Sequence, residues 1–212
     1  MRMRKKPWAA NELLTNPHII QEPLNQAYKM NEHFSKNQPI HVEIGCGRGR
    51  FISQCAAKNP HINHIAIERE PTALATAARL ARETEGEAAL IFLMLDAAEL
   101  PEYFKPGDIS RLYINFCDPW PRKKKWAKRR LTHSNFLALY EGLKIPEIFF
   151  KTDNRILFEF SINQFSERAW IMRNVSLDLH NSAVGLEDNI MTEYEEKFSA
   201  FGPIYRLEAF LP

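Results

Sequence analysis

Short apolar runs alternate with longer segments of helical periodicity along most of the chain. Seven runs have the length of strands, and they are Ile40–Ile44, Ile62–Glu68, Ala89–Leu95, Arg111–Cys117, Glu147–Lys151, Val175–Leu179 and Ile204–Ala209. The first of them are apolar throughout instead of alternating with polar residues, which is typical of parallel strands buried on both faces. The pattern therefore predicts an α/β fold with a mostly parallel, seven-stranded sheet.

Four longer helices are predicted between these strands, at Arg50–Lys58, Pro71–Glu83, Thr132–Leu143 and Ile156–Trp170. Helices that alternate with strands in this way cover both faces of a parallel sheet. Residues 39–212 are therefore expected to form one domain. The polar residues 1–38, which contain several prolines, are expected to form a basic N-terminal arm in front of it.

The composition is that of a globular protein, with 45% hydrophobic and 25% charged residues among 212. The longest apolar runs, such as Ala88–Leu95, are much shorter than the roughly 20 residues of a membrane-spanning helix. The basic N-terminus is not followed by the apolar stretch of a signal peptide. A cytoplasmic protein without a membrane partner is therefore expected.

Three widely spaced cysteines, Cys46, Cys55 and Cys117, fit neither a disulfide framework nor a zinc site. We expect them to be small buried apolar residues in a reducing compartment, and we expect no metal.

Basic residues are concentrated in two places although the net charge is only +2. Four of the first six residues are basic, as are seven of the nine from Arg122 to Arg130. Lysine-rich surfaces are common, so the second run could be an ordinary solvated face. Its density and the Trp126 within it favour contacts with the phosphates of a polyanion.

Three glycines, Gly45, Gly47 and Gly49, lie between the first strand and the first helix, and Glu43 precedes them. Such a loop lets the backbone turn tightly and come close to a ligand at the carboxyl ends of the strands. The third glycine comes one residue earlier than in the dinucleotide-binding pattern, and Glu43 would repel a pyrophosphate. A ligand with ammonium and sulfonium charges suits this acid, which favours S-adenosylmethionine.

Two more acids end the next strands. Glu68 lies about twenty residues after the loop, where a carboxylate can accept hydrogen bonds from ribose hydroxyls. Asp96 ends the third predicted strand and is placed to meet the amino group of an adenine. The alternative is that both acids only cap helices or close turns.

The fourth strand leads into a proline-stiffened turn that runs from Asn115 to Pro121. Each proline fixes its own φ and restricts the preceding residue, so Asp118 and Trp120 are expected to be held beside the glycine loop.

Several segments together resemble the bacterial tRNA (guanine-N7-)-methyltransferases over nearly the whole chain. They are Arg2–Arg4, Lys6–Trp8, Glu43–Gly49, Asn115–Pro121, Lys128–Leu131, Lys151–Asn154 and Thr192–Phe198. The resemblance implies a Rossmann-like class I methyltransferase fold. It also implies transfer of a methyl group from S-adenosylmethionine to N7 of a guanine in the tRNA variable loop.

The resemblance also implies roles for single residues. Asp118 would be the catalytic residue and would contribute to the cofactor site. N7 already has an in-plane lone pair, so we expect the Asp118 carboxylate to bind the N1–H and N2–H₂ edge of guanine instead of removing a proton. The substrate-binding residues implied are Arg122, Asp153, Thr192, Glu193, Tyr194 and Glu195.

Some of these residues have structural interpretations too. Thr192 and Glu195 form a capping-box pattern, and we expect that cap to be real and to make a rigid base for Glu193 and Tyr194.

The segment Leu143–Phe149 lacks the glycine pair usual in the family before the fifth strand.

Three other functions remain open from the sequence. They are a nicotinamide-dependent oxidoreductase, a non-catalytic RNA-binding module on this fold, and a methyltransferase for exocyclic amines. The sequence leaves the oligomeric state open between a monomer and a homodimer.

Overall fold

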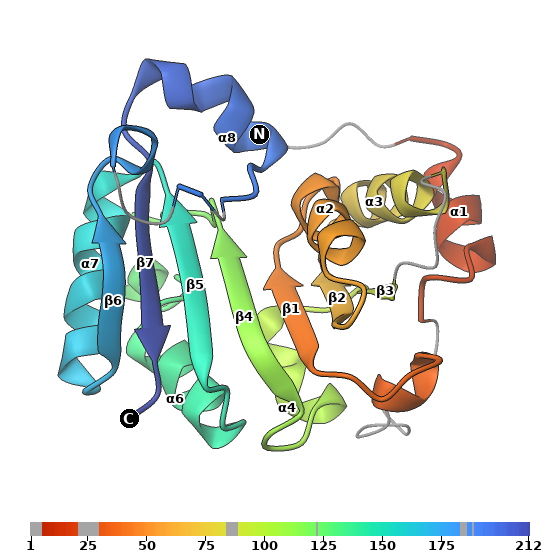
Figure 1. Ribbon diagram of the computed structural model, residues 1–212, viewed down its shortest axis with the longest axis horizontal. Coiled ribbons are helices and arrows are strands. Elements are labelled where there is room, and N and C mark those ends of the chain that lie inside the picture. Colours follow the sequence, from red (N-terminus) through yellow and green to blue (C-terminus); the bar gives the residue numbers. More distant parts are fainter. Residues whose placement is uncertain (1–5, 21–29, 84–88, 122, 183–185, 188) are drawn as a thin grey trace.

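A computed structural model describes residues 6–20, 30–83, 89–121, 123–182, 186–187 and 189–212. Its centre is one sheet of seven strands (Figure 1). In spatial order they are β3 (Leu90–Leu93), β2 (Asn63–Ile67), β1 (Ile40–Ile44), β4 (Ile109–Asn115), β5 (Glu147–Thr152), β7 (Tyr205–Phe210) and β6 (Ile171–Ser176). The five strands from β3 to β5 are parallel to their neighbours, and β7 is antiparallel to both β5 and β6. The predicted α/β fold is confirmed.

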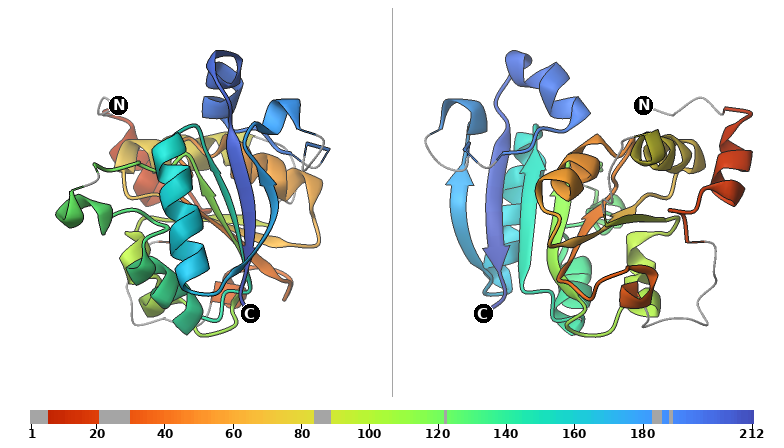
Figure 2. Two further views of the ribbon diagram at one scale, coloured as in Figure 1. Left: turned by 90° about the vertical axis from the view of Figure 1, so that its left-hand side faces the viewer. Right: turned by 45° about the vertical axis from the view of Figure 1, so that its right-hand side comes forward.

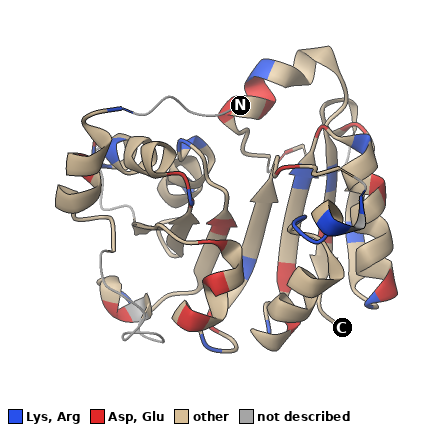
Figure 3. Ribbon diagram, turned by 180° about the vertical axis from the view of Figure 1, so that it is seen from behind, with Lys and Arg blue, Asp and Glu red and all other residues tan. Residues whose placement is uncertain are grey.

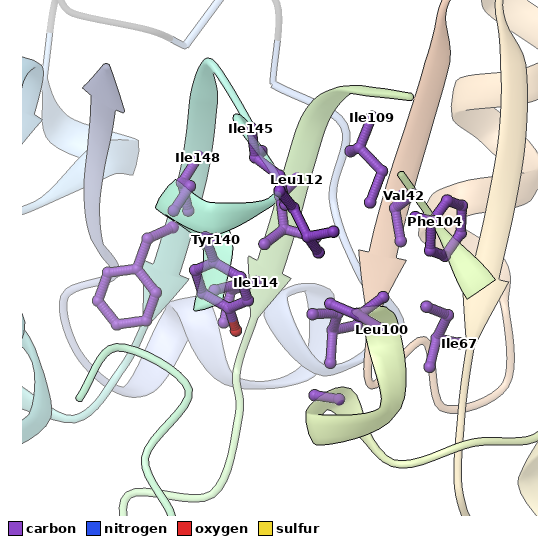
Figure 4. Packing of buried hydrophobic residues seen from close by; sticks show 14 of the residues in the cluster. Val42, Ile67, Leu100, Phe104, Ile109, Leu112, Ile114, Tyr140, Ile145 and Ile148 are labelled. Atoms are coloured by element: carbon purple, nitrogen blue, oxygen red, sulfur yellow. The ribbon is translucent and has the colours of Figure 1, made fainter. Parts of the chain in front are cut away.

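Helices cover both faces of the sheet. The larger apolar cluster joins one face to α4 (Leu100–Tyr103), α6 (Ser134–Gly142) and α7 (Arg155–Glu167), and Figure 4 shows part of it. The second cluster joins the other face to α2 (Arg50–Lys58) and α3 (Pro71–Glu83). The order of the strands reverses between β1 and β4, so the carboxyl ends of these two strands border the crevice where open α/β sheets bind ligands.

The two early helices have the predicted bounds, whereas the end of the chain differs from the prediction. β6 begins at Ile171, four residues before the expected Val175. Helix α7 ends at Glu167, and Ala169 adopts a left-handed conformation with φ of 60°. This residue reverses the chain immediately after the helix, so the strand starts earlier than its apolar residues indicate.

The described part of the expected N-terminal arm packs against the domain. Helix α1 (Ala9–Thr15) lies beside α3 (Figure 1), and Glu12 pairs with Arg82 at 3.2 Å. Ile20 then donates a backbone hydrogen bond of 3.1 Å to the carbonyl of Phe92 in the edge strand β3. Residues 1–5 and 21–29 lie outside the described residues, so the basic residues Arg2, Arg4 and Lys5 of the expected arm do as well.

In the described segments, no helix is long and apolar enough to cross a membrane. The three cysteines are free, and Cys46 and Cys55 are buried. Among the described residues, no group of three or more His, Cys, Asp or Glu side chains is arranged to hold a metal ion.

Candidate active site

A cavity of about 390 Å³ opens at the carboxyl ends of the parallel strands. Its walls include one predicted site residue after each of β1, β2, β3 and β4, namely Gly45, Glu68, Asp96 and Asp118. Apolar residues such as Ile44, Ile67 and Phe136 form other parts of the wall. The sheet therefore brings four of the predicted positions together, although they are spread over the sequence from position 45 to position 118.

The glycine loop has a backbone that favours glycine. Gly45, Gly47 and Gly49 have φ of 76°, 56° and 78°, in the left-handed region. A Cβ atom on Gly49 would lie 2.6 Å from the Cβ of Ala77, so the third glycine also allows α2 and α3 to pack closely. The backbone amide of Gly45 donates to the carbonyl of Ile67 at 2.8 Å, which fixes the loop to the end of β2.

Glu68 ties two loops of the cavity together. One carboxylate oxygen accepts the backbone N–H of Gly47 at 3.1 Å, and the other accepts those of Arg69 and Glu70 at 2.9 Å each. A carboxylate has about four acceptor positions, so this one can still accept from a ligand. Glu68 is thus a turn residue, as the structural interpretation predicts, and it retains acceptor capacity at the cavity.

Asp96 also forms local backbone contacts. Its side chain accepts the backbone N–H of Ala98 at 3.1 Å, and Glu99 accepts the N–H of Asp96 at 2.7 Å, which completes a capping box. Half of the Asp96 side-chain surface remains exposed at the cavity. The cap holds the carboxylate in a fixed position and does not cover it.

Glu43 lies differently from the other acids. The pleat of β1 turns it away from Val42 and Ile44, and it is not among the described residues that line the cavity. One of its oxygens accepts from Asn115 at 2.9 Å, while the other has no hydrogen-bond partner among the described residues. Burial raises the pKa of Glu43 to about 7. A nearby cationic group would stabilise its charged form.

The turn after β4 has a strained backbone and is held by hydrogen bonds from a buried side chain. Phe116 and Trp120 have φ of 49° and 38°, which is unusual for bulky residues. Arg130 is buried and donates hydrogen bonds of 2.7 Å to the carbonyls of Pro119 and Trp120. Arg130 therefore belongs to the interior and shapes the turn, although the sequence places it in a run predicted to contact phosphates. No local feature of the sequence distinguishes it from its basic neighbours.

Asp118 projects from this turn with 70% of its side-chain surface exposed. The guanidinium of Arg69 lies between it and Asp96, at 4.0 Å from the Asp118 carboxylate and 3.6 Å from that of Asp96. Pairs this exposed hold side chains only weakly, so both carboxylates remain available to a ligand.

Helix α8 (Glu193–Phe198) borders the same end of the sheet (Figure 1). The predicted capping box is confirmed, because Thr192 accepts the N–H of Glu195 at 2.9 Å and Glu195 reaches back to Thr192. Glu195 itself is fully buried and pairs with Lys151 at 2.6 Å and with His180 at 3.1 Å. Burial lowers the pKa of Lys151, and the Glu195 charge opposes that shift.

Tyr194 connects α8 to the turn after β4. Its hydroxyl donates to Asp153 at 2.8 Å, and its ring packs on Phe116 with 5.0 Å between the ring centroids. Glu193 pairs with Arg48 at 3.2 Å next to the glycine loop. Thus Asp153, Glu193 and Tyr194 are accessible near the turn, Glu195 is not, and Arg122 lies outside the described residues.

Positive charge is concentrated close to the cavity. Figure 3 shows Lys and Arg gathered on α5 (Lys124–Ala127) and on the segment after it. Lys128 and Arg129 from this segment are exposed and line the cavity.

Comparisons with known proteins agree with this arrangement. The sequence profile of the family described as "Putative methyltransferase" matches residues 37–207. A tRNA (guanine-N(7)-)-methyltransferase of Bacillus subtilis is 50% identical over 212 residues, which covers 98% of both chains. One of Lysinibacillus sphaericus is 47% identical and covers 99% of this chain and 97% of its own length.

Solved structures support the fold. "Crystal Structure of 16S rRNA Methyltranferase KamB" superposes with a TM-score of 0.62 at 14% identity, and covers 88% of this chain and 96% of that one. A 16S rRNA (adenine(1408)-N(1))-methyltransferase from Catenulisporales acidiphilia, solved with its cosubstrate SAM, has a TM-score of 0.51 at 14% identity, with 81% and 85% covered. The sequence relatives place this chain in the tRNA (guanine-N(7)-)-methyltransferase family.

Proposed function

We propose that the protein transfers the methyl group of S-adenosylmethionine to N7 of a guanine in the variable loop of tRNA. The observation that carries this proposal is the position of Asp118, an exposed carboxylate on a rigid turn at the edge of a cavity lined by Glu68 and Asp96. The cavity and the turn meet at the switch point of the sheet, where a cofactor and a base can be brought together.

The residues of the cavity fit S-adenosylmethionine. The left-handed glycine loop leaves room for a close ligand, since a Cβ on Gly45 or Gly47 would touch nothing within 4 Å. Glu68 is placed to accept from the ribose hydroxyls and Asp96 from the adenine amino group. Glu43 does not line this cavity and is not one of the proposed contacts with the cofactor. When bound, S-adenosylmethionine supplies a methyl group on a positively charged sulfur.

Asp118 binds and orients the base in this proposal. Its carboxylate accepts from N1–H and N2–H₂ of guanine and offsets the positive charge that the purine gains. Adenine lacks this donor pair and is rejected. The N7 lone pair is already free, so the protein contributes alignment and electrostatic stabilisation, and no general base is needed. A guanine stacked in the tRNA loop has to be turned out to reach Asp118.

The residues around α8 hold the substrate side. Asp153 and Tyr194 form one hydrogen-bonded unit beside the turn, and Glu193 borders the glycine loop. Thr192 and Glu195 act through the cap and the Lys151 pair, which set the position of the helix. Arg122 and its basic neighbours bind phosphates. A tRNA substrate is consistent with a cytoplasmic protein that needs no membrane.

Incubation with methyl-labelled S-adenosylmethionine and unmodified tRNA tests this function, with nucleoside analysis of the product. We expect 7-methylguanosine with the wild type. Asp118→Ala should reduce the rate by at least about a hundredfold, which corresponds to about 2.7 kcal/mol in the transition state. Asp118→Asn, which is matched in shape, should recover little, because an amide cannot accept from both donors.

The products separate the alternatives. A methylated exocyclic amine would support that class of methyltransferase and contradict the proposed role of Asp118. Binding of tRNA without any methylated nucleoside would support the RNA-binding module.

A further inference from the structure

Two tryptophans form a stack at the edge of the cavity. The rings of Trp120 and Trp126 lie almost parallel, with an angle of 6° between their planes and 5.5 Å between their centroids. Trp120 belongs to the turn after β4, and Trp126 belongs to α5. The Arg129 guanidinium lies 4.8 Å from the Trp120 centroid and 5.1 Å from that of Trp126. We call these three side chains the tryptophan platform.

The tryptophan platform is only partly covered by the protein. Both rings are half-buried and Arg129 is exposed, unlike the aromatic residues of the core, such as Phe150 and Phe158. In the left view of Figure 2, the green helix α5 projects from the body of the molecule. Trp120 and Arg129 also line the cavity that holds Asp118. The aromatic surface is thus continuous with the proposed guanine site.

The surroundings of the platform select a polyanion with flat apolar groups. Lys123, Lys125 and Lys128 are exposed around it, and the nitrogen of Lys125 lies 5.9 Å from the Trp126 centroid. Exposed π faces among cationic side chains bind unpaired bases by stacking while the cations contact the backbone. A peptide or lipid ligand would leave this combination of flat rings and dispersed positive charge unused.

We propose that the tryptophan platform, through Trp126, stacks on an unpaired tRNA base adjacent in sequence to the methylated guanine. This inference rests on the proposed function. When the guanine is turned out toward Asp118, its neighbours lose a stacking partner. Stacking on the Trp126 ring replaces that partner and offsets part of the cost of turning the guanine out. The Trp120–Trp126 centroid spacing indicates rings already in contact, so the base lies on the outer face of the pair.

A mutant cycle between protein and RNA tests the platform. The protein variants are Trp126→Ala and Trp126→Phe, and the RNAs are intact tRNA and tRNAs with an abasic site on either side of the target guanine. We expect Trp126→Ala to weaken binding of intact tRNA about tenfold, as one lost base–aromatic stack implies. Trp126→Phe should recover most of this affinity. For the wild type, one of the abasic tRNAs should bind about tenfold more weakly than intact tRNA. For Trp126→Ala, that abasic tRNA and intact tRNA should bind equally well.

Lys125→Ala is the matched control on the same helix. It removes a charge and no ring, so it should weaken all three RNAs by the same factor and reduce the salt dependence of binding. Binding of S-adenosylmethionine and circular dichroism should be unchanged in every variant, which checks that the site is intact.

The cycle has a clear contrary result. Trp126→Ala could bind intact tRNA like the wild type, or the affinity losses from Trp126→Ala and from the abasic site could simply multiply. Either result would mean that the Trp126 ring and that base do not touch, and the proposed stacking would be wrong. Because binding is measured directly, this result does not depend on turnover. Failure of the wild type to methylate tRNA would instead contradict the proposed function.

Discussion

The two halves of the candidate site are built in different ways. The cofactor half consists of loops that directly follow β1, β2 and β3, and its geometry comes from left-handed glycines, a cap at Asp96 and short backbone contacts of Glu68. The substrate half is assembled from segments far apart in the chain. Arg130 donates hydrogen bonds to carbonyls of the turn after β4. Lys151 pairs with Glu195 of α8, which lies 44 positions later in the chain.

The difference shows where each half is vulnerable. Local conformation sets the cofactor half, so a substitution there acts mainly through backbone strain or one carboxylate. Buried charges set the substrate half, and the loss of one partner leaves the other unpaired in the interior. Substitutions in the two halves should therefore differ in the kind and the size of their effects.

Lys151→Met should be the most damaging change in the substrate half. It removes the buried lysine that pairs with Glu195, whose other ionic partner is His180, and should lower the free energy of unfolding by about 3 kcal/mol. Urea denaturation measures this effect. The double variant Lys151→Met with Glu195→Gln should recover part of the loss, because the charge on Glu195 is removed as well. If Lys151→Met costs less than about 1 kcal/mol, α8 is not held by this pair.

Glu43→Gln tests the acid that lies between the two halves. The pKa of Glu43 is raised to about 7 in the fold from the ordinary 4.5, so the folded state binds the extra proton between these values. Its contribution to stability is therefore present below about pH 4.5 and lost as the pH rises to 7. The amide resembles the protonated acid. Glu43→Gln should therefore match the wild type near pH 4.5 and exceed it by about 3 kcal/mol at pH 8.

The histidine pair His41 and His64 gives the opposite slope in the wild type. Burial lowers their pKa values to about 3 and about 4, so stability falls as the pH drops below their ordinary 6.5. The wild type and Glu43→Gln share this slope, and the difference between them isolates Glu43. Equal stability of the two proteins at every pH would contradict the raised pKa.

Gly49→Ala tests the cofactor half. The new Cβ would meet Ala77 at 2.6 Å on a backbone with φ of 78°, which should cost about 1–2 kcal/mol of stability and weaken cofactor binding. Thermal unfolding and calorimetric titration with S-adenosylmethionine measure the two effects. Gly142→Ala is the control, because a Cβ there meets nothing within 4 Å. Equal behaviour of the two variants would mean that the loop tolerates a side chain.

Arg130→Lys should produce the smallest effect and the most specific one. Lysine cannot donate to the carbonyls of Pro119 and Trp120 with the geometry of a guanidinium, so Asp118 becomes less well placed. We expect kcat to fall about tenfold, close to 1.4 kcal/mol, while the affinity for S-adenosylmethionine is kept. A role in phosphate binding would instead raise KM for tRNA and leave kcat unchanged.

The sequence by itself determined the succession of strands and helices along the chain, the glycine loop, and the caps at Asp96 and Thr192. These features depend on residues a few positions apart, whose periodicity and conformational preferences can be read locally. The resemblance added the family and the importance of Asp118.

Only the tertiary structure decided which way particular side chains point. In the fold, Glu43 points toward Asn115 and away from the cavity, and Arg130 points inward although it belongs to a basic run. Glu195 is buried against Lys151. Strand β6 begins earlier than expected. The physical reason is that a buried charge takes its position from partners on other elements. Those partners become neighbours only when the sheet and its helices have packed.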